Sequence, residues 1–201
     1  MRFRILTCLA VLALGAGCGS DPEIRPIQAS SVIVAFGDSI TAGTGAEKPE
    51  SYPARLSERL GCRVVNAGVP GEETPAGLRR LPGVLSREDP DLVILCLGGN
   101  DMLSKRTHES IRANLGTMIE LVKDSGADLV LLGVPKPGLL LRPPPFYEEL
   151  AEAHHIPLDR TTIPDILSTP SEKSNQIHPN ADGYARLANA VAALIRDSQG
   201  D

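Results

Sequence analysis

The sequence predicts an α/β domain built on a mainly parallel β-sheet that helices cover on both faces. Short apolar runs alternate along the chain with segments whose apolar residues recur at helical spacing. The short runs are continuously apolar, which is typical of strands buried on both faces. A chain of 201 residues, 42% hydrophobic and 22% charged, fits one globular domain with a sizeable core.

Five strands are expected, each followed by a helical segment. The first run is rich in β-branched residues and stops at Gly37, and the third stops at Gly98-Gly99. A long amphipathic helix at 108–124 is ended by Gly126. The strands are expected at 31–36, 63–67, 91–97, 128–134 and 156–158, and the helices at 52–60, 74–87, 108–124, 146–155 and 180–197.

The first 17 residues have the pattern of a signal peptide. Arg2 and Arg4 precede an apolar stretch of about ten residues, too short to span a bilayer as a mature helix. Small residues and then Cys18 follow, a run that resembles a bacterial lipobox. We therefore predict a signal peptide over 1–17, a lipid anchor on Cys18 that holds the protein at a membrane, and an exported, periplasmic or cell-envelope location. The alternative is an ordinary secretory signal with an incidental Cys18.

Composition narrows the remaining organisation and the possible partners. Residues 18–30, with two prolines, are expected to form a flexible tether to a folded domain at 31–198. A formal net charge of −5, without a block of Lys or Arg, argues against nucleic-acid binding. We expect a monomer.

Cysteine and histidine placement gives little support to metal or redox chemistry. Cys62 and Cys96 lie beside apolar runs and are expected to be buried thiols, although a disulfide between them stays open. The sequence has no CxxC or HExxH, and its four histidines do not cluster. We expect neither a metal nor another cofactor.

The residues with chemical potential follow the predicted strands. Ligands of open parallel sheets bind beyond the carboxyl ends of the strands. Glycine and polar residues gather there and just before the last helix, in the runs GDSI at 37–40, NAGVPGEET at 66–74, GGND at 98–101 and NQIHPN at 175–180.

Together these runs supply the parts needed for acyl transfer. Ser39 is a candidate nucleophile, Gly71 N–H and the Asn100 amide are candidate oxyanion donors, and His178 is a candidate base. Each part also has a plainer interpretation as a turn, a strand end, a helix cap or a loop histidine. The order of the four runs, and their placement after successive strands, favours one shared catalytic site over four unrelated local features.

The same four runs resemble those of the SGNH (GDSL) hydrolase family, in particular its bacterial arylesterase, acyl-thioesterase and lysophospholipase branch. The resemblance covers residues 32–197. It implies a flavodoxin-like three-layer α/β/α sandwich with a mainly parallel five-stranded sheet, and serine esterase activity. It also implies that Ser39 is the nucleophile, that His178 is the base, and that the oxyanion hole is formed by the Ser39 and Gly71 N–H groups and the Asn100 side chain.

One position departs from the family's pattern. The family has Asp three residues before the catalytic histidine, and this chain has Asn175. If the Asn175 NH₂ group faces His178 Nδ1, it favours the wrong imidazole tautomer, whereas Oδ1 would favour the right one. A backbone carbonyl or a carboxylate such as Glu172 could also take over.

The rim of the expected site suggests the substrate. A proline-flanked loop carries three leucines at 139–141, and Met102 and Leu103 follow Asn100. We predict Met102, Leu139 and Leu140 as substrate contacts, and short- to medium-chain acyl esters or thioesters as substrates. The leucines could instead pack under the next helix.

Two other functions stay open. A catalytically weak or inactive family member that binds an envelope ligand is motivated by Asn175. A nucleotide- or flavin-binding protein on the same sheet topology is disfavoured, because neither GxGxxG nor a P-loop motif is present.

Overall fold

The computed structural model describes residues 22–136, 138 and 140–200 of the chain. The predicted signal peptide, the predicted anchor Cys18 and the predicted substrate contact Leu139 lie outside these residues. None of the helices in the described ranges is long and apolar enough to cross a membrane.

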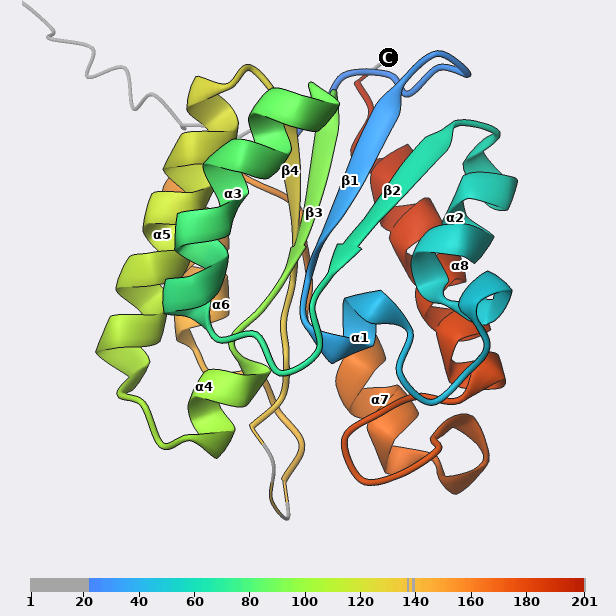
Figure 1. Ribbon diagram of the computed structural model, residues 1–201, viewed down its shortest axis with the longest axis vertical. Helices are drawn as coiled ribbons and strands as arrows, with labels where there is room; N and C mark the ends of the chain where they lie inside the picture. Colours follow the sequence, from blue (N-terminus) through green and yellow to red (C-terminus); the bar gives the residue numbers. More distant parts are fainter. Residues whose placement is uncertain (1–21, 137, 139, 201) are drawn as a thin grey trace, which may run out of the picture.

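A five-stranded parallel sheet forms the centre of the domain (Figure 1). Its order is β2-β1-β3-β4-β5, which is the doubly wound, flavodoxin-like order with a topological switch between β1 and β3. The strands are β1 Val32–Gly37, β2 Arg63–Gly68, β3 Leu92–Cys96, β4 Asp128–Leu132 and β5 Leu158–Asp159. The predicted fold class is therefore confirmed.

The strand register places Gly37, Gly68 and Cys96 at the same level of the sheet. Gly37 at the end of β1 pairs with Gly68 on one side and with Cys96 on the other. The loops that follow β1, β2 and β3 consequently leave the sheet at one edge. The fifth strand begins at Leu158 rather than at the predicted residue 156, because Pro157 has no N–H to give to the ladder.

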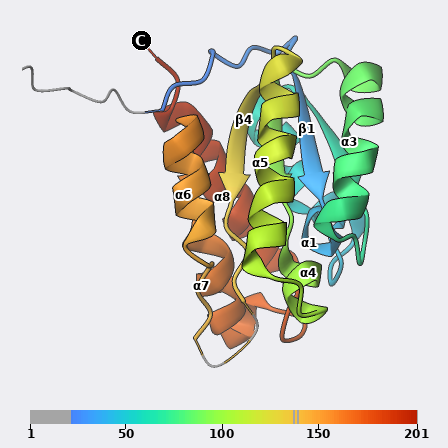
Figure 2. The same cartoon turned by 90° about the vertical axis from the view of Figure 1, so that its left-hand side faces the viewer.

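Helices cover both faces of the sheet. One face carries α3 Thr74–Glu88, α5 His108–Asp124 and α6 Phe146–His154, of which α5 and α6 lie side by side in Figure 2. The opposite face carries α2 Tyr52–Leu60 and α8 Ala181–Asp197, which pack against each other. These five helices match the predicted ones within one residue at each end.

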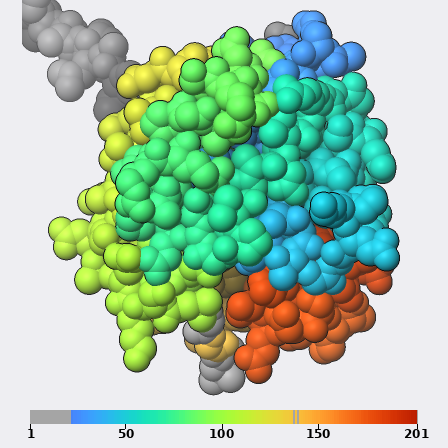
Figure 3. Space-filling view, in the orientation of Figure 1, coloured from blue at the N-terminus to red at the C-terminus, as the bar shows by residue number. Residues whose placement is uncertain are grey.

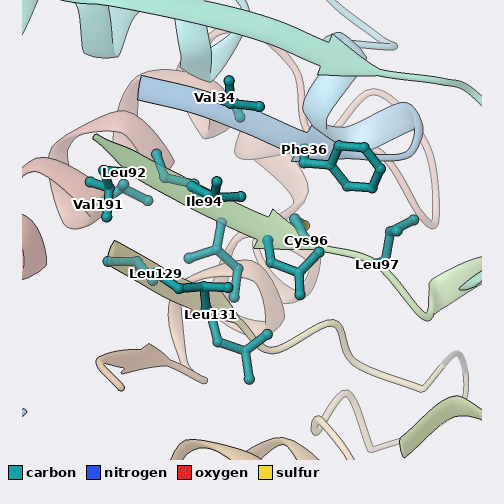
Figure 4. Close-up of a cluster of buried hydrophobic side chains, with 14 of the residues drawn as sticks. Val34, Phe36, Leu92, Ile94, Cys96, Leu97, Leu129, Leu131 and Val191 are labelled. Atoms are coloured by element: carbon teal, nitrogen blue, oxygen red, sulfur yellow. The ribbon is translucent and has the colours of Figure 1, made fainter. Parts of the chain in front are cut away.

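The core lies between the sheet and the two helical layers (Figure 4). Every residue of β3 is buried, as its continuously apolar sequence predicts. Strand β2 is half-exposed because it lies at the edge of the sheet. Cys62 and Cys96 are buried free thiols, so the structure contains no disulfide between them.

Five short elements at the loops were not predicted. They are α1 Ser39–Ala42, η1 Lys48–Glu50, α4 Gly99–Leu103, α7 Thr162–Ser168 and η2 Pro170–Glu172. Each has at most two turns, which is too short for an apolar period to be visible in the sequence.

The chain before β1 packs on the domain from Ile24 onward. Ile24 is buried and pairs with Gln199, and Arg25 donates to Asp128 Oδ2 through its backbone nitrogen at 2.8 Å and its Nε at 2.9 Å. This part of the segment therefore differs from the expected flexible tether. It lies at the amino edge of the sheet, opposite α1 and α4 (Figure 1).

Candidate active site

The predicted nucleophile lies on a tight turn between β1 and α1. Ser39 is the first residue of α1, and the carboxylate of Asp38 caps that helix by accepting the Ile40 N–H at 3.0 Å. The turn requires glycine at position 37, because a Cβ there would collide with Thr41 Oγ1 and with the Cys96 carbonyl oxygen. The Ser39 hydroxyl is thus presented at the carboxyl edge of the sheet.

The predicted base reaches this hydroxyl from the loop before α8. His178 Nε2 lies 2.9 Å from Ser39 Oγ, although 139 residues separate the two in sequence. The Ser174 N–H donates to the His178 carbonyl at 3.0 Å, and an isolated bridge pairs Lys173 with Pro179. Figure 3 shows the segment around α1 (blue) beside this loop (orange-red).

Asn175 contacts the other ring nitrogen of His178 through its amide nitrogen. Asn175 Nδ2 lies 3.0 Å from His178 Nδ1, while Asn175 Oδ1 accepts the N–H groups of Ile177 and His178, both at 3.0 Å. These two backbone donors assign the amide orientation, since a flipped amide would point NH₂ at them. Nδ1 is therefore an acceptor, and the neutral imidazole carries its hydrogen on Nε2.

No carboxylate replaces Asn175 at this nitrogen among the described residues. Glu172, one of the expected alternatives, accepts from Arg186 at 2.8 Å instead. Burial alone lowers the pKa of His178 from its ordinary value. The histidine is consequently neutral around pH 7, with Nε2–H pointing at the Ser39 hydroxyl.

The predicted oxyanion donor Asn100 lies at the start of α4, which follows β3. Its amide nitrogen donates to Asp38 Oδ2 and to the Glu72 carbonyl, each at 3.1 Å. Burial raises the pKa of Asp38 to about 7; the hydrogen bond from Ile40 opposes this shift, and the charges of Asp101 and Glu72 add to it.

The second predicted donor, Gly71, lies in the exposed turn between β2 and α3. Its φ of +79° suits glycine, and the Glu72 N–H closes the turn on the Val69 carbonyl at 3.0 Å. Among the described residues the Gly71 N–H has no acceptor, so it is available to a ligand.

Buried polar contacts fix this turn on both sides. Glu72 accepts a fork from Arg80 at 2.9 and 2.6 Å, and Arg80 stacks over the Phe36 ring. Thr74 donates its N–H and its hydroxyl to the fully buried carboxylate of Asp101, the hydroxyl at 2.6 Å. The sequence did not single out these supporting side chains, because their pairing depends on the folded loop.

An apolar pocket of about 440 Å³, open toward solvent, adjoins Ser39 and His178. This volume includes the open solvent at the mouth of the pocket. Ser39, Asn100 and His178 line the polar part of the pocket. Its apolar lining residues are Ile40, Leu103, Val134, Pro135, Leu141, Leu167 and Ile177.

Two of the predicted substrate contacts do not line this pocket. Met102 is buried in the core, because α4 turns it inward and directs Leu103 to the pocket. Leu140 is 72% exposed, whereas the next residue, Leu141, lines the pocket. The leucine-rich loop therefore contributes through a neighbouring position.

The part of the chain that the structure describes has no candidate metal site. The described residues contain no group of three or more His, Cys, Asp or Glu side chains that could hold a metal ion.

Comparison with known proteins gives one consistent result. Residues 35–186 match the model of the GDSL-like lipase/acylhydrolase family. The chain is 31% identical over 183 residues to an arylesterase of Vibrio mimicus, a match that covers 82% of this chain and 88% of the relative. It is 28% identical over 176 residues to thioesterase 1/protease 1/lysophospholipase L1 of Escherichia coli K12, covering 84% and 85%. The crystal structure of TesA superposes with a TM-score of 0.75 at 28% identity, covering 83% of this chain and 98% of TesA.

Proposed function

Because the chain belongs to the GDSL-like lipase/acylhydrolase family, we propose that this carboxylic ester hydrolase acts through an acyl intermediate on Ser39. The observation that carries the proposal is the 2.9 Å contact between His178 Nε2 and Ser39 Oγ. A nucleophile and a base within hydrogen-bond reach are the minimum requirement for serine-based acyl transfer.

The reaction proceeds in two halves. Ser39 Oγ attacks the acyl carbon and gives its proton to His178 Nε2, which passes it to the leaving alcohol or thiol. The Ser39 and Gly71 N–H groups and the Asn100 amide hold the tetrahedral oxyanion. His178 then takes a proton from a water molecule that attacks the acyl carbon, the bond from that carbon to Ser39 Oγ breaks, the proton passes to Oγ, and the carboxylic acid leaves.

Asn175 limits the rate of both halves. Its amide favours the tautomer with hydrogen on Nε2, which has no lone pair for the serine proton. The amide also carries no charge to stabilise the imidazolium that forms. Catalysis therefore depends on the minor tautomer, with hydrogen on Nδ1.

The substrates are short- to medium-chain acyl esters or thioesters. The apolar lining from α4, α7 and the β4–α6 loop supports an acyl chain lying against Leu103, Leu141 and Leu167. Relatives named arylesterase and thioesterase/lysophospholipase support the same substrate class.

The test is hydrolysis of p-nitrophenyl esters from acetate to laurate by the mature chain carrying Cys18→Ser, beside the same protein with Ser39→Ala. We expect slow hydrolysis that favours the shorter chains and falls to the background rate in Ser39→Ala. Hydrolysis that persists in Ser39→Ala, or an equal rate for all chain lengths, would contradict the proposal.

The orientation of the Asn175 amide also favours a second candidate, a protein that binds an envelope ester without turning it over. This candidate predicts saturable protection of Ser39 from a phosphonate probe by an ester that is recovered intact. Release of alcohol at a Ser39-dependent rate excludes it.

We further propose that the chain is exported and anchored through Cys18, on the sequence pattern of its first 18 residues. Expression in a Gram-negative bacterium with labelled palmitate should give label in the parent and none in Cys18→Ser. An unlabelled parent would leave the ordinary secretory signal as the explanation, and label in Cys18→Ser would place the lipid on another residue; either result contradicts the proposed anchor.

A further inference from the structure

The buried carboxylate of Asp38 lies between the nucleophile and the oxyanion donor, and the proposed reaction gives it no role. Only 3% of the residue is exposed. Its Oδ1 accepts the Ile40 N–H at 3.0 Å, and its Oδ2 accepts the Asn100 amide at 3.1 Å. One side chain thus connects the turn of Ser39 with the group expected to hold the oxyanion.

The Asn100 amide is held by two acceptors from different loops. Besides Asp38 in the β1–α1 turn, the Glu72 carbonyl in the β2–α3 loop accepts from Asn100 Nδ2, also at 3.1 Å. A flipped amide would place its oxygen against both of these oxygens, so the pair determines which amide atom faces them. Both hydrogens already have acceptors, so an oxyanion beside Asn100 Nδ2 would share one of these hydrogens with Asp38 or Glu72.

We propose that Asp38 is a positioning residue, which keeps the Asn100 amide nitrogen in the oxyanion hole at a fixed place relative to Ser39. The inference rests on the proposed acyl transfer and adds a residue to it. An oxyanion donor is effective only when it is already oriented toward the place where charge develops. Asp38 supplies that orientation from the same turn that presents the nucleophile.

A role as a helix cap alone would not require aspartate. Asparagine caps helices as well as aspartate does, and the Oδ1 of Asp38→Asn can still accept the Ile40 N–H. The NH₂ group of Asp38→Asn, however, would face the Asn100 NH₂ group, and two donors repel. This variant therefore keeps the cap and removes the proposed orientation.

The test is a double-mutant cycle in an Asn175→Asp background, with kcat and KM measured for p-nitrophenyl butyrate. Asn100→Ala should lower kcat by about 10²–10³, the usual loss for one oxyanion donor. Asp38→Asn should lower kcat by at least about 10-fold with little change in KM, and adding it to Asn100→Ala should cost nothing more. An unchanged kcat in Asp38→Asn, or losses that multiply in the double variant, would overturn the proposal.

Two further variants separate positioning from stability. Asp38→Ser retains a capping oxygen but is too short to reach Asn100, so it should lose kcat as Asp38→Asn does. Tyr52→Phe removes a buried hydroxyl that contacts Thr41 of the same helix at 3.3 Å. It should lower Tm and leave kcat unchanged.

A spectroscopic measurement keeps this inference separate from the proposed function. In ¹⁵N spectra of the Asn175 protein, the Asn100 side-chain amide should show slow hydrogen exchange, and Asp38→Asn should shift it while the Ile40 amide remains in place. An unmoved Asn100 signal overturns the positioning role whether or not any ester is hydrolysed. If instead no variant shows Ser39-dependent hydrolysis, the proposed function fails. The spectra alone then test whether Asp38 holds the Asn100 amide.

Discussion

Replacing Asn175 with aspartate should raise kcat for ester hydrolysis by about 10⁴, the loss caused by the reverse change in a serine protease triad. The substitution is nearly isosteric. Oδ1 can still accept the Ile177 and His178 N–H groups, and the second carboxylate oxygen takes the place of Nδ2, 3.0 Å from His178 Nδ1. Nδ1 then carries the hydrogen, and Nε2 is free to accept the serine proton.

The pH dependence of kcat/KM should change with the rate. In the parent, burial lowers the pKa of His178. The carboxylate of Asn175→Asp favours the charged imidazolium and raises this pKa. Because a protonated His178 cannot act as a base, the acid limb of kcat/KM should move to higher pH in the variant.

Two controls make the result specific. Ser171→Asp adds the same charge to the same loop at an exposed position that does not contact His178, and it should leave kcat unchanged. Mass spectrometry of the parent should exclude deamidation of Asn175, since a small deamidated fraction would mimic residual activity. A parent already as fast as Asn175→Asp would show that the amide does not limit the reaction.

The sequence indicated which side chains would meet, because Ser39 and Asn100 lie in short runs just after strand ends and His178 lies just before the last helix. The parallel sheet brings the ends of β1 and β3 to one edge, which places Asn100 beside the turn of Ser39, and the loop before α8 then brings His178 to Ser39. The sequence could not assign the Asn175 amide. Its orientation depends on two backbone N–H groups, those of Ile177 and His178, which converge on Oδ1 only in the folded loop.

The substrate side of the site was harder to predict for a related reason. The helix α4 is too short to show a period in sequence, so the segment after Asn100 gave no sign of which neighbour faces the pocket. The structure turns Leu103 outward and Met102 into the core. Arg25 likewise packs against Asp128, which lies 103 positions further along the chain. Because the sequence around Arg25 does not show this contact, it predicts a flexible tether instead.

The second large effect is the loss of kcat that His178→Ala should cause, and its size depends on which residue occupies position 175. In the parent, the neutral imidazole mainly presents Nε2–H to Ser39 and acts as a base only through its minor tautomer, so His178→Ala should lower kcat by no more than about 10²-fold. In the Asn175→Asp background the histidine is a working base, and His178→Ala should cost about 10⁴ or more.

Measuring kcat for all four combinations gives the coupling between the two residues directly. Asp and His act as one unit when the carboxylate fixes the tautomer, and such units are strongly non-additive. Equal losses on His178→Ala in both backgrounds would mean that the histidine accepts the serine proton regardless of its neighbour. The amide of Asn175 would then serve only to shape the loop through the two N–H groups bound to its oxygen.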